Sequence, residues 1–223
     1  MKSSHNSLFT GLAIGAAFVC FAQSASAQAG LQVTPPSGIV PGAAAGGAAP
    51  AIENMIRIRS LTDLKDIPQR VTPLGNRSGK QKYWGVFDAV FDTTPDWLDE
   101  VTVTYTVILQ NPRPKQGEKP MSLYTLTVDY ADVASGRDHK VGAVLPPAAL
   151  LRYGAPIGFA AQFSIGGRPA GELGVPNVLN GAQKWWSNSA VLNSPQVQKR
   201  DGLMERGKSP FALVDIDNYE VAK

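Results

Sequence analysis

The segment Lys82–Gln110, KYWGVFDAVFDTTPDWLDEVTVTYTVILQ, constrains the fold more than any other part of the chain. From Val101 to Gln110, large apolar side chains alternate almost without interruption with threonine. Side chains of a β-strand point to opposite faces in turn, so this alternation predicts a strand with one buried face. The first half, Tyr83–Asp92, is apolar on both faces, which is typical of an inner strand.

The stretch Thr93-Thr94-Pro95-Asp96 has the composition of a turn, because proline fixes φ and aspartate bonds to its own backbone. It therefore predicts a β-hairpin within Lys82–Gln110. The same patterns predict further strands at Met55–Arg59, Ser122–Val133, His139–Leu145, Ile157–Ile165, Arg168–Val175 and Phe211–Tyr219. About seven or eight short strands without a βαβ rhythm predict an all-β sandwich or barrel.

The segments between these strands are read from their turn residues. Pro146–Tyr153 is followed by Gly154, and this order predicts one short helix. Gly166-Gly167 predicts a tight primed turn, since both residues tolerate positive φ. The segments predicted to be loops or exposed polar stretches are Ser60–Lys80, Ser135–Asp138, Asn111–Pro120 and Gln196–Lys208.

The chain divides into three regions by composition. Residues 1–27 predict a secretory signal peptide, with Lys2 at its start, an apolar run and an Ala25-Ser26-Ala27 cleavage site. An uncleaved signal that acts as a membrane anchor is the alternative. Residues 28–51 are rich in Ala, Gly and Pro and predict a disordered linker. Residues 52–223 predict the folded domain, which carries no transmembrane segment.

Charge and cysteine usage narrow the class further. The net charge is +3 and charged residues make up 17% of the chain, so no large basic surface for nucleic acid or membrane is indicated. Cys20 lies in the predicted signal peptide, so the folded domain has no disulfide. An exported domain without disulfides fits a bacterial envelope protein, in the periplasm, at the outer membrane surface or outside the cell.

The sequence predicts no catalytic, cofactor-binding or metal-binding residues. His139 is the single histidine outside the predicted signal peptide, which excludes a Cys/His metal cluster. Asp138 precedes it, but neighbours on a strand face opposite ways, so this pair is poorly placed for a triad. The chain has no G-x-S-x-G, phosphate-loop or dinucleotide motif. The acidic groups at Asp96–Glu100 and Asp215–Asp217 fit either Ca²⁺ or a solvated surface.

The pair Trp185-Trp186 is the candidate binding surface. It lies in a polar, asparagine-rich stretch, where exposed indoles would stack on sugar rings or anchor a protein partner. The alternative is that one tryptophan lies in the core and the other is half covered.

Two segments carry a resemblance to a known family. Val144–Gly154 (VLPPAALLRYG) and Ser209–Val214 (SPFALV), with the order signal, linker and sandwich, resemble exported immunoglobulin-like proteins associated with type IV pilus-like genes in verrucomicrobia. The resemblance covers roughly residues 52–223 and rests on packing motifs. It implies an immunoglobulin-like fold, an envelope or pilus-associated role and no catalytic residues to transfer.

The sequence thus predicts a non-enzymatic, exported β-sandwich that binds protein partners in an envelope or pilus-like assembly. A carbohydrate-binding module that uses exposed tryptophans is the alternative, with a glycan as its ligand.

Overall fold

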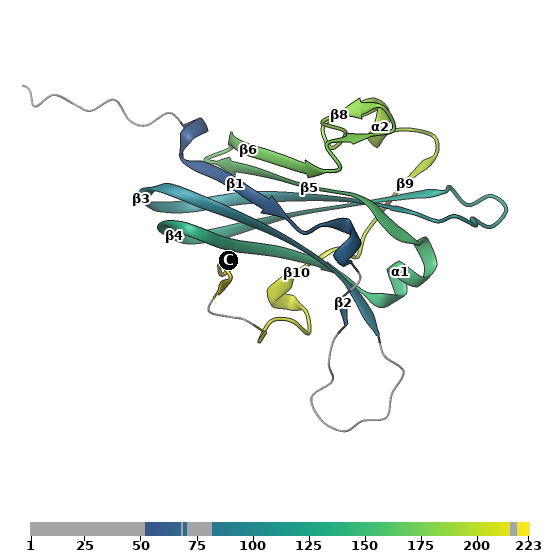
Figure 1. Ribbon diagram of the computed structural model, residues 1–223, viewed down its shortest axis with the longest axis horizontal. Coiled ribbons are helices and arrows are strands. Elements are labelled where there is room, and N and C mark those ends of the chain that lie inside the picture. Colours follow the sequence, from purple (N-terminus) through teal and green to yellow (C-terminus); the bar gives the residue numbers. More distant parts are fainter. Residues whose placement is uncertain (1–51, 68, 71–81, 215–217) are drawn as a thin grey trace, which may run out of the picture. The chain divides into compact units, whose positions relative to one another are not determined.

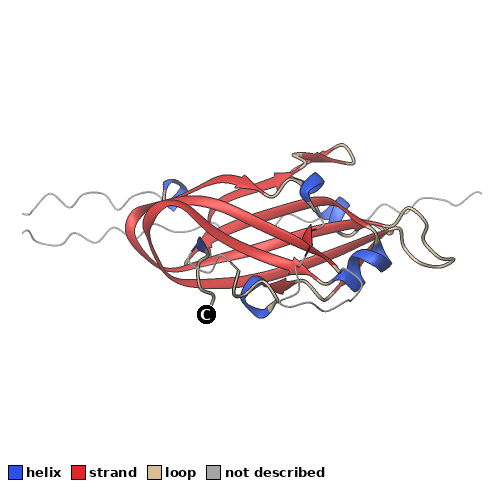
Figure 2. Ribbon diagram, turned by 60° about the horizontal axis from the view of Figure 1, so that its bottom comes forward, coloured by secondary structure: helices blue, strands red, loops and turns tan. Residues whose placement is uncertain are grey.

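The computed structural model describes residues 52–67, 69–70, 82–214 and 218–223. They form an all-β, immunoglobulin-like sandwich (Figures 1 and 2). The predicted signal peptide and most of the linker lie outside the described residues. Among the residues described, no helix is long and apolar enough to cross a membrane.

The strands are β1 (Ile56–Leu61), β2 (Gln69–Arg70), β3 (Tyr83–Gln110), β4 (Met121–Leu145), β5 (Ala155–Ile165), β6 (Arg168–Val175), β7 (Val178–Leu179), β8 (Ala182–Gln183), β9 (Val197–Arg200) and β10 (Met204–Glu205). The α-helices are α1 (Pro147–Tyr153) and α2 (Ser189–Leu192), and 3-10 turns are η1 (Ile52–Asn54), η2 (Leu64–Asp66) and η3 (Arg206–Lys208). The main sheet has the order β10-β4-β3-β5-β6.

The two long strands β3 and β4 run through the whole sandwich as one antiparallel pair (Figure 2). Their register begins at Gly85↔Leu145, ends at Gln110↔Met121 and shifts around Thr93. Before this shift β3 also pairs with β1, and after it β3 pairs with β5. The two layers of the sandwich therefore share β3 and β4, which bend from one layer into the other.

The hairpin predicted within Lys82–Gln110 is wrong, because β3 continues through residues 93–96. The Thr93 hydroxyl donates to the Ala134 carbonyl (2.7 Å) and accepts from the Gly136 amide (3.0 Å). These bonds hold β3 and β4 together at the point where the register between them shifts. The residues that predicted a turn therefore form a bend within a continuous strand. The turn predicted at Ser135–Asp138 likewise lies within β4.

The buried apolar side chains form three clusters, one between the two layers and one on the outer face of each layer. The main core, between the layers, includes Phe87, Phe91, Tyr105, Tyr130, Phe159 and Phe163. A second cluster lies on the outer face of β3, β4 and β5 and includes Trp185 and Trp186. A third lies on the outer face of the other layer, where Phe211 covers Val86 and Val144.

The strand predicted at Phe211–Tyr219 is wrong for the residues that the structure describes there. Residues 211–214 form turns, while residues 215–217 lie outside the described part. Phe211 instead packs edge-on against Trp84, with ring centroids 6.1 Å apart. The preceding segment, 196–208, is also less exposed than predicted, because it forms β9 and β10 and buries Arg206.

Several local predictions are confirmed. Helix α1 ends before Gly154, and Gly166 and Gly167 have φ of 54° and 74° in the β5–β6 turn. Strand β6 has the predicted bounds, Arg168–Val175. The sandwich also contains a second short helix, α2, in the segment after β8.

Candidate functional site

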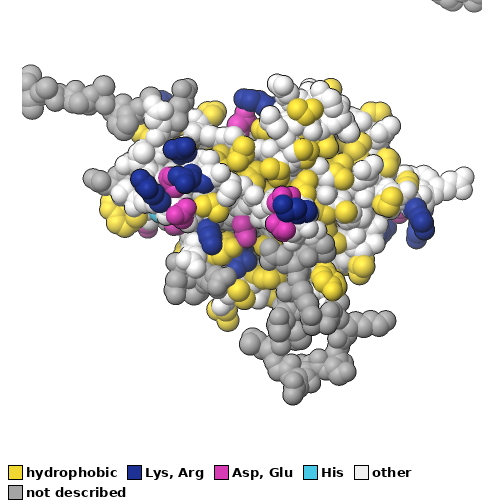
Figure 3. Space-filling view, viewed as in Figure 1, with side chains coloured by type: hydrophobic (Ala, Val, Ile, Leu, Met, Phe, Trp, Pro, Cys, Tyr) yellow, Lys and Arg dark blue, Asp and Glu magenta, His cyan; other side chains and the backbone are white. Residues whose placement is uncertain are grey.

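An apolar groove of about 900 Å³ opens at the end of the sandwich where α1 lies. We call it the α1 groove. Its apolar lining comes from separate parts of the chain: Tyr83, Pro112, Pro147, Leu150, Leu151 and Pro156. The volume is within the range of pockets that hold a ligand or a short peptide segment. Figure 3 shows hydrophobic side chains extending across the surface from β5 towards α1.

Two large apolar side chains of the α1 groove remain exposed. Leu151 is 88% exposed and Tyr83 is 47% exposed. Leu150, the neighbour of Leu151, packs against the main core and holds the helix on the sandwich. An exposed apolar patch beside other apolar side chains is typical of a surface that contacts another molecule.

The shape of the α1 groove depends on Gly154. Its φ is +91°, and its amide donates to the Leu150 carbonyl to end α1. A Cβ at this position would overlap the backbone carbonyl of Gln110. Glycine therefore allows the chain to leave the helix and start β5 directly against the end of β3, which forms one wall of the groove.

The charged residue in the described lining of the α1 groove is Lys82. Arg152 follows Leu151 on α1. Arg152 lies 3.7 Å from Glu118, and both are partly exposed, so the pair stabilises the fold little. The charge of Lys82 favours a partner that places an acidic group beside it.

A second hollow, of about 650 Å³, adjoins the α1 groove. We call it the amide cavity, because its polar lining is Gln110, Asn180, Asn188, Ser194 and Gln196. None of the described residues that line it is charged. It shares Gln110 and Ile157 with the α1 groove, so the two hollows meet at these residues.

The predicted binding surface, Trp185 and Trp186, is buried. The two residues are 0% and 4% exposed, and their rings pack edge to face with centroids 5.7 Å apart. Trp185 Nε1 donates to the Pro176 carbonyl (2.9 Å), and Trp186 Nε1 donates to Glu172 Oε2 (2.9 Å). The indoles hold the segment after β6 onto the sheet and offer no face to a sugar ring.

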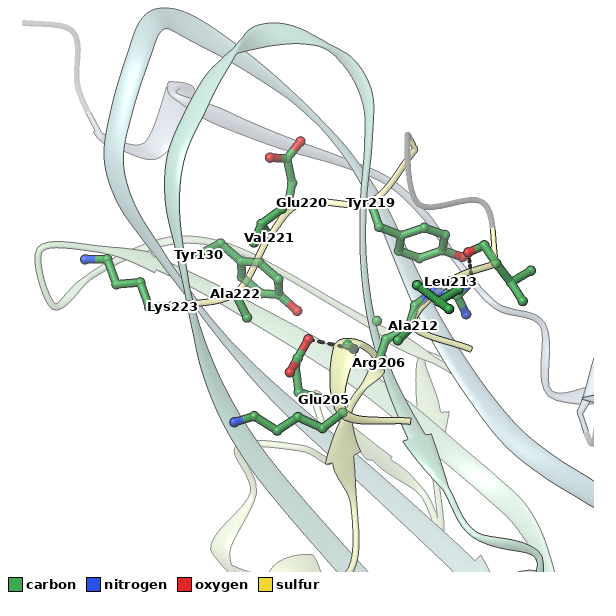
Figure 4. Close-up of a pocket in the computed structure, with 14 residues that line it drawn as sticks. Tyr130, Glu205, Arg206, Ala212, Leu213, Tyr219, Glu220, Val221, Ala222 and Lys223 are labelled. Atoms are coloured by element: carbon green, nitrogen blue, oxygen red, sulfur yellow. Dashed lines mark hydrogen bonds between the residues drawn. The ribbon is translucent and has the colours of Figure 1, made fainter. Parts of the chain in front are cut away.

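A third cavity, of about 440 Å³, lies beneath the C-terminal segment (Figure 4). Tyr130 is at its edge, and its hydroxyl lies 2.8 Å from that of Tyr105. Burial raises the pKa of both phenols. Arg206 is buried against the Tyr219 ring, at 3.9 Å, and donates to the Val214 carbonyl. The tyrosine pair thus joins β3 to β4, and Arg206 fastens the C-terminal segment.

His139 lies between two side chains in an arrangement that resembles a triad. Its Nδ1 is 2.6 Å from Glu220, and its Nε2 is 3.2 Å from Thr93 Oγ1. The Thr93 hydroxyl, however, gives its hydrogen to the Ala134 carbonyl and is 6% exposed. Neither Thr93 nor His139 lines any of the cavities described above. The arrangement therefore serves to tie the C-terminal segment to β4.

The acidic clusters considered for Ca²⁺ lie only in part among the described residues. Within the described part of the chain, no group of three His, Cys, Asp or Glu side chains is placed to hold a metal ion. Asp215 and Asp217 lie outside the described residues.

The fold and the α1 groove together define a class, an immunoglobulin-like sandwich with an exposed apolar groove. A protein-family model matches residues 64–223, more than half of the chain, and the chain belongs to that family. It is also similar to a crystal structure of a protein from Akkermansia muciniphila, with a TM-score of 0.58 and 15% identity. That match covers 76% of this chain and 92% of the other.

At this identity the likeness shows a shared fold. Akkermansia is a verrucomicrobium, the group to which the resemblance in the sequence pointed. A search of curated proteins finds no similar sequence.

The sequence did not single out the α1 groove residues as a site. Leu150 and Leu151 were assigned to a helix, but their partners Tyr83 and Pro112 come from distant positions. The sequence carries no signal that Leu151 is exposed, since two consecutive leucines of a short amphipathic helix commonly both face the core.

Proposed function

We propose that this protein is a non-enzymatic, exported binding protein of the bacterial cell envelope that docks a protein partner in a pilus-like assembly. The observation that carries the proposal is the α1 groove, with Leu151 at 88% exposure beside further apolar side chains. Hydrophobic anchors surrounded by a polar rim are the usual core of a protein interface.

Export and envelope location are supported by the composition of residues 1–27 and of the linker that follows. Pilus association is supported by the resemblance of Val144–Gly154 and Ser209–Val214 to a family with that association. The shared fold with a verrucomicrobial protein is consistent with it. A sugar-binding role loses its support, because Trp185 and Trp186 are buried.

The test is site-specific photo-crosslinking in the cells that produce the protein. A photoreactive residue replaces Leu151, and the control carries it at Leu213, which is 83% exposed but lies outside the groove. We expect a crosslink from position 151, and not from 213, to an envelope or pilus-like component. Equal crosslinking from both positions, or none, would refute the proposal.

A further inference from the structure

The α1 groove and the amide cavity meet at a β-bulge in β5. The β3–β5 ladder passes from Ile108↔Gly158 directly to Leu109↔Pro156, so Ile157 is an extra residue without a partner on β3. Its side chain lines both hollows. Bulges redirect a side chain and are frequent beside functional sites.

On its other edge, the same part of β5 pairs with no strand that the structure describes. The β5–β6 ladder ends at Phe159↔Val175, so Ala155–Gly158 extend beyond the last paired residue. The start of β5 therefore lies between an apolar hollow and a polar one, with no strand paired on its β6 side among the residues described.

The two hollows differ in lining, and a polypeptide offers a group for each: polar peptide groups for the amide cavity and apolar side chains for the α1 groove. Amide side chains such as Gln110 and Gln196 offer a donor and an acceptor each, as the peptide group does. The α1 groove accommodates apolar side chains, and the cation of Lys82 in its lining favours an acidic residue. A neutral glycan fits the amide cavity but not the groove, where Tyr83 supplies the one aromatic ring among the described lining residues.

We infer that the two hollows form one site for an extended peptide segment of the partner. Its apolar side chains lie in the α1 groove, its main chain or polar side chains bond to the amide cavity, and an acidic residue faces Lys82. Side chains of an extended segment point alternately to two sides, so the segment alternates apolar and polar residues. This inference rests on the proposed function and specifies the partner.

The experiment selects a random dodecapeptide library on the full chain and measures the selected peptides by fluorescence anisotropy. We expect enrichment of alternating apolar residues with an acidic residue. Leu151→Glu should weaken binding at least tenfold, because it places a charge in the groove. The double variant Gln110→Ala/Gln196→Ala should weaken it about three- to tenfold, since each lost hydrogen bond has a modest effect. Gln198→Ala is the control, because Gln198 is exposed outside the cavity.

Two results would overturn the inference and leave the proposed function intact. One is that Leu151 crosslinks to an envelope partner while no alternating peptide is enriched. The other is that peptides bind with equal affinity to the double glutamine variant and to wild type. Binding of a neutral glycan array, lost in the double variant, with no peptide bound would also overturn it.

Discussion

Tyr219 donates a hydrogen bond of 2.8 Å to Asp88 Oδ2 and so joins the C-terminal segment to β3, 131 positions earlier in the chain. The second oxygen of this carboxylate, Oδ1, is buried without a hydrogen-bond partner among the described residues. Gly142, opposite Asp88 in the ladder, leaves the space, since a Cβ there would overlap Oδ1.

Tyr219→Phe should destabilise the fold by about 1–3 kcal/mol, because it leaves a buried carboxylate with neither oxygen bonded. The ring contact with Arg206 is retained. Tyr153→Phe is the matched control: its ring lies 3.8 Å from Arg200, and the structure gives its hydroxyl no hydrogen bond among the described residues. Urea unfolding of both variants checks this, and equal losses would contradict it.

Asp88→Asn should change how stability depends on pH. Burial raises the pKa of Asp88 above 3.8, although the Tyr219 hydrogen bond and the Arg206 and Lys140 charges oppose the shift. The folded state then holds the proton more tightly than the unfolded state. This contribution to the unfolding free energy is complete below pH 3.8 and is lost as the pH rises through the folded pKa.

The asparagine variant lacks this titration. Its unfolding free energy should therefore rise relative to wild type as the pH increases from below 3.8 to above the folded pKa of Asp88. Urea titrations at a series of pH values measure the difference. A difference that is constant with pH, or that falls, would be inconsistent with the burial of this carboxylate.

Gly174→Ala should destabilise the protein by about 1–3 kcal/mol, because its Cβ would overlap the six-membered ring of the buried Trp186. Gly171→Ala in the same strand is the control. A Cβ at Gly171 would meet Ile58 at 3.5 Å, an ordinary contact. Thermal unfolding should separate the two variants clearly, and similar midpoints would show that Trp186 is not fixed against β6.

The sequence predicted correctly those elements whose structure is decided by residues adjacent in the chain. Helix α1, the Gly166-Gly167 turn and the bounds of β6 each depend on local geometry, and each is confirmed. Thr93–Asp96 was misread, because pairing with β4 and the Thr93 hydrogen bonds override its local preference for a turn. Phe211–Val214 alternates like a strand, but Phe211 is used to cover Val86 and Val144.

The tryptophans show why exposure is hard to read from sequence. Their polar neighbours suggested a surface, whereas the space that buries them is provided by Gly158 and Gly174 on β5 and β6. The α1 groove was not predictable from any one segment, since distant residues meet there only after β3 and β5 have paired.

The central claim is that the α1 groove docks a protein partner, and quantitative affinity capture from envelope extract tests it most directly. Leu151→Glu is compared with Leu213→Glu, because both leucines are more than four-fifths exposed and their substitution should leave stability within about 0.5 kcal/mol. We predict an envelope protein that wild type and Leu213→Glu retain equally and that Leu151→Glu loses at least tenfold. The same capture by all three proteins would contradict the claim.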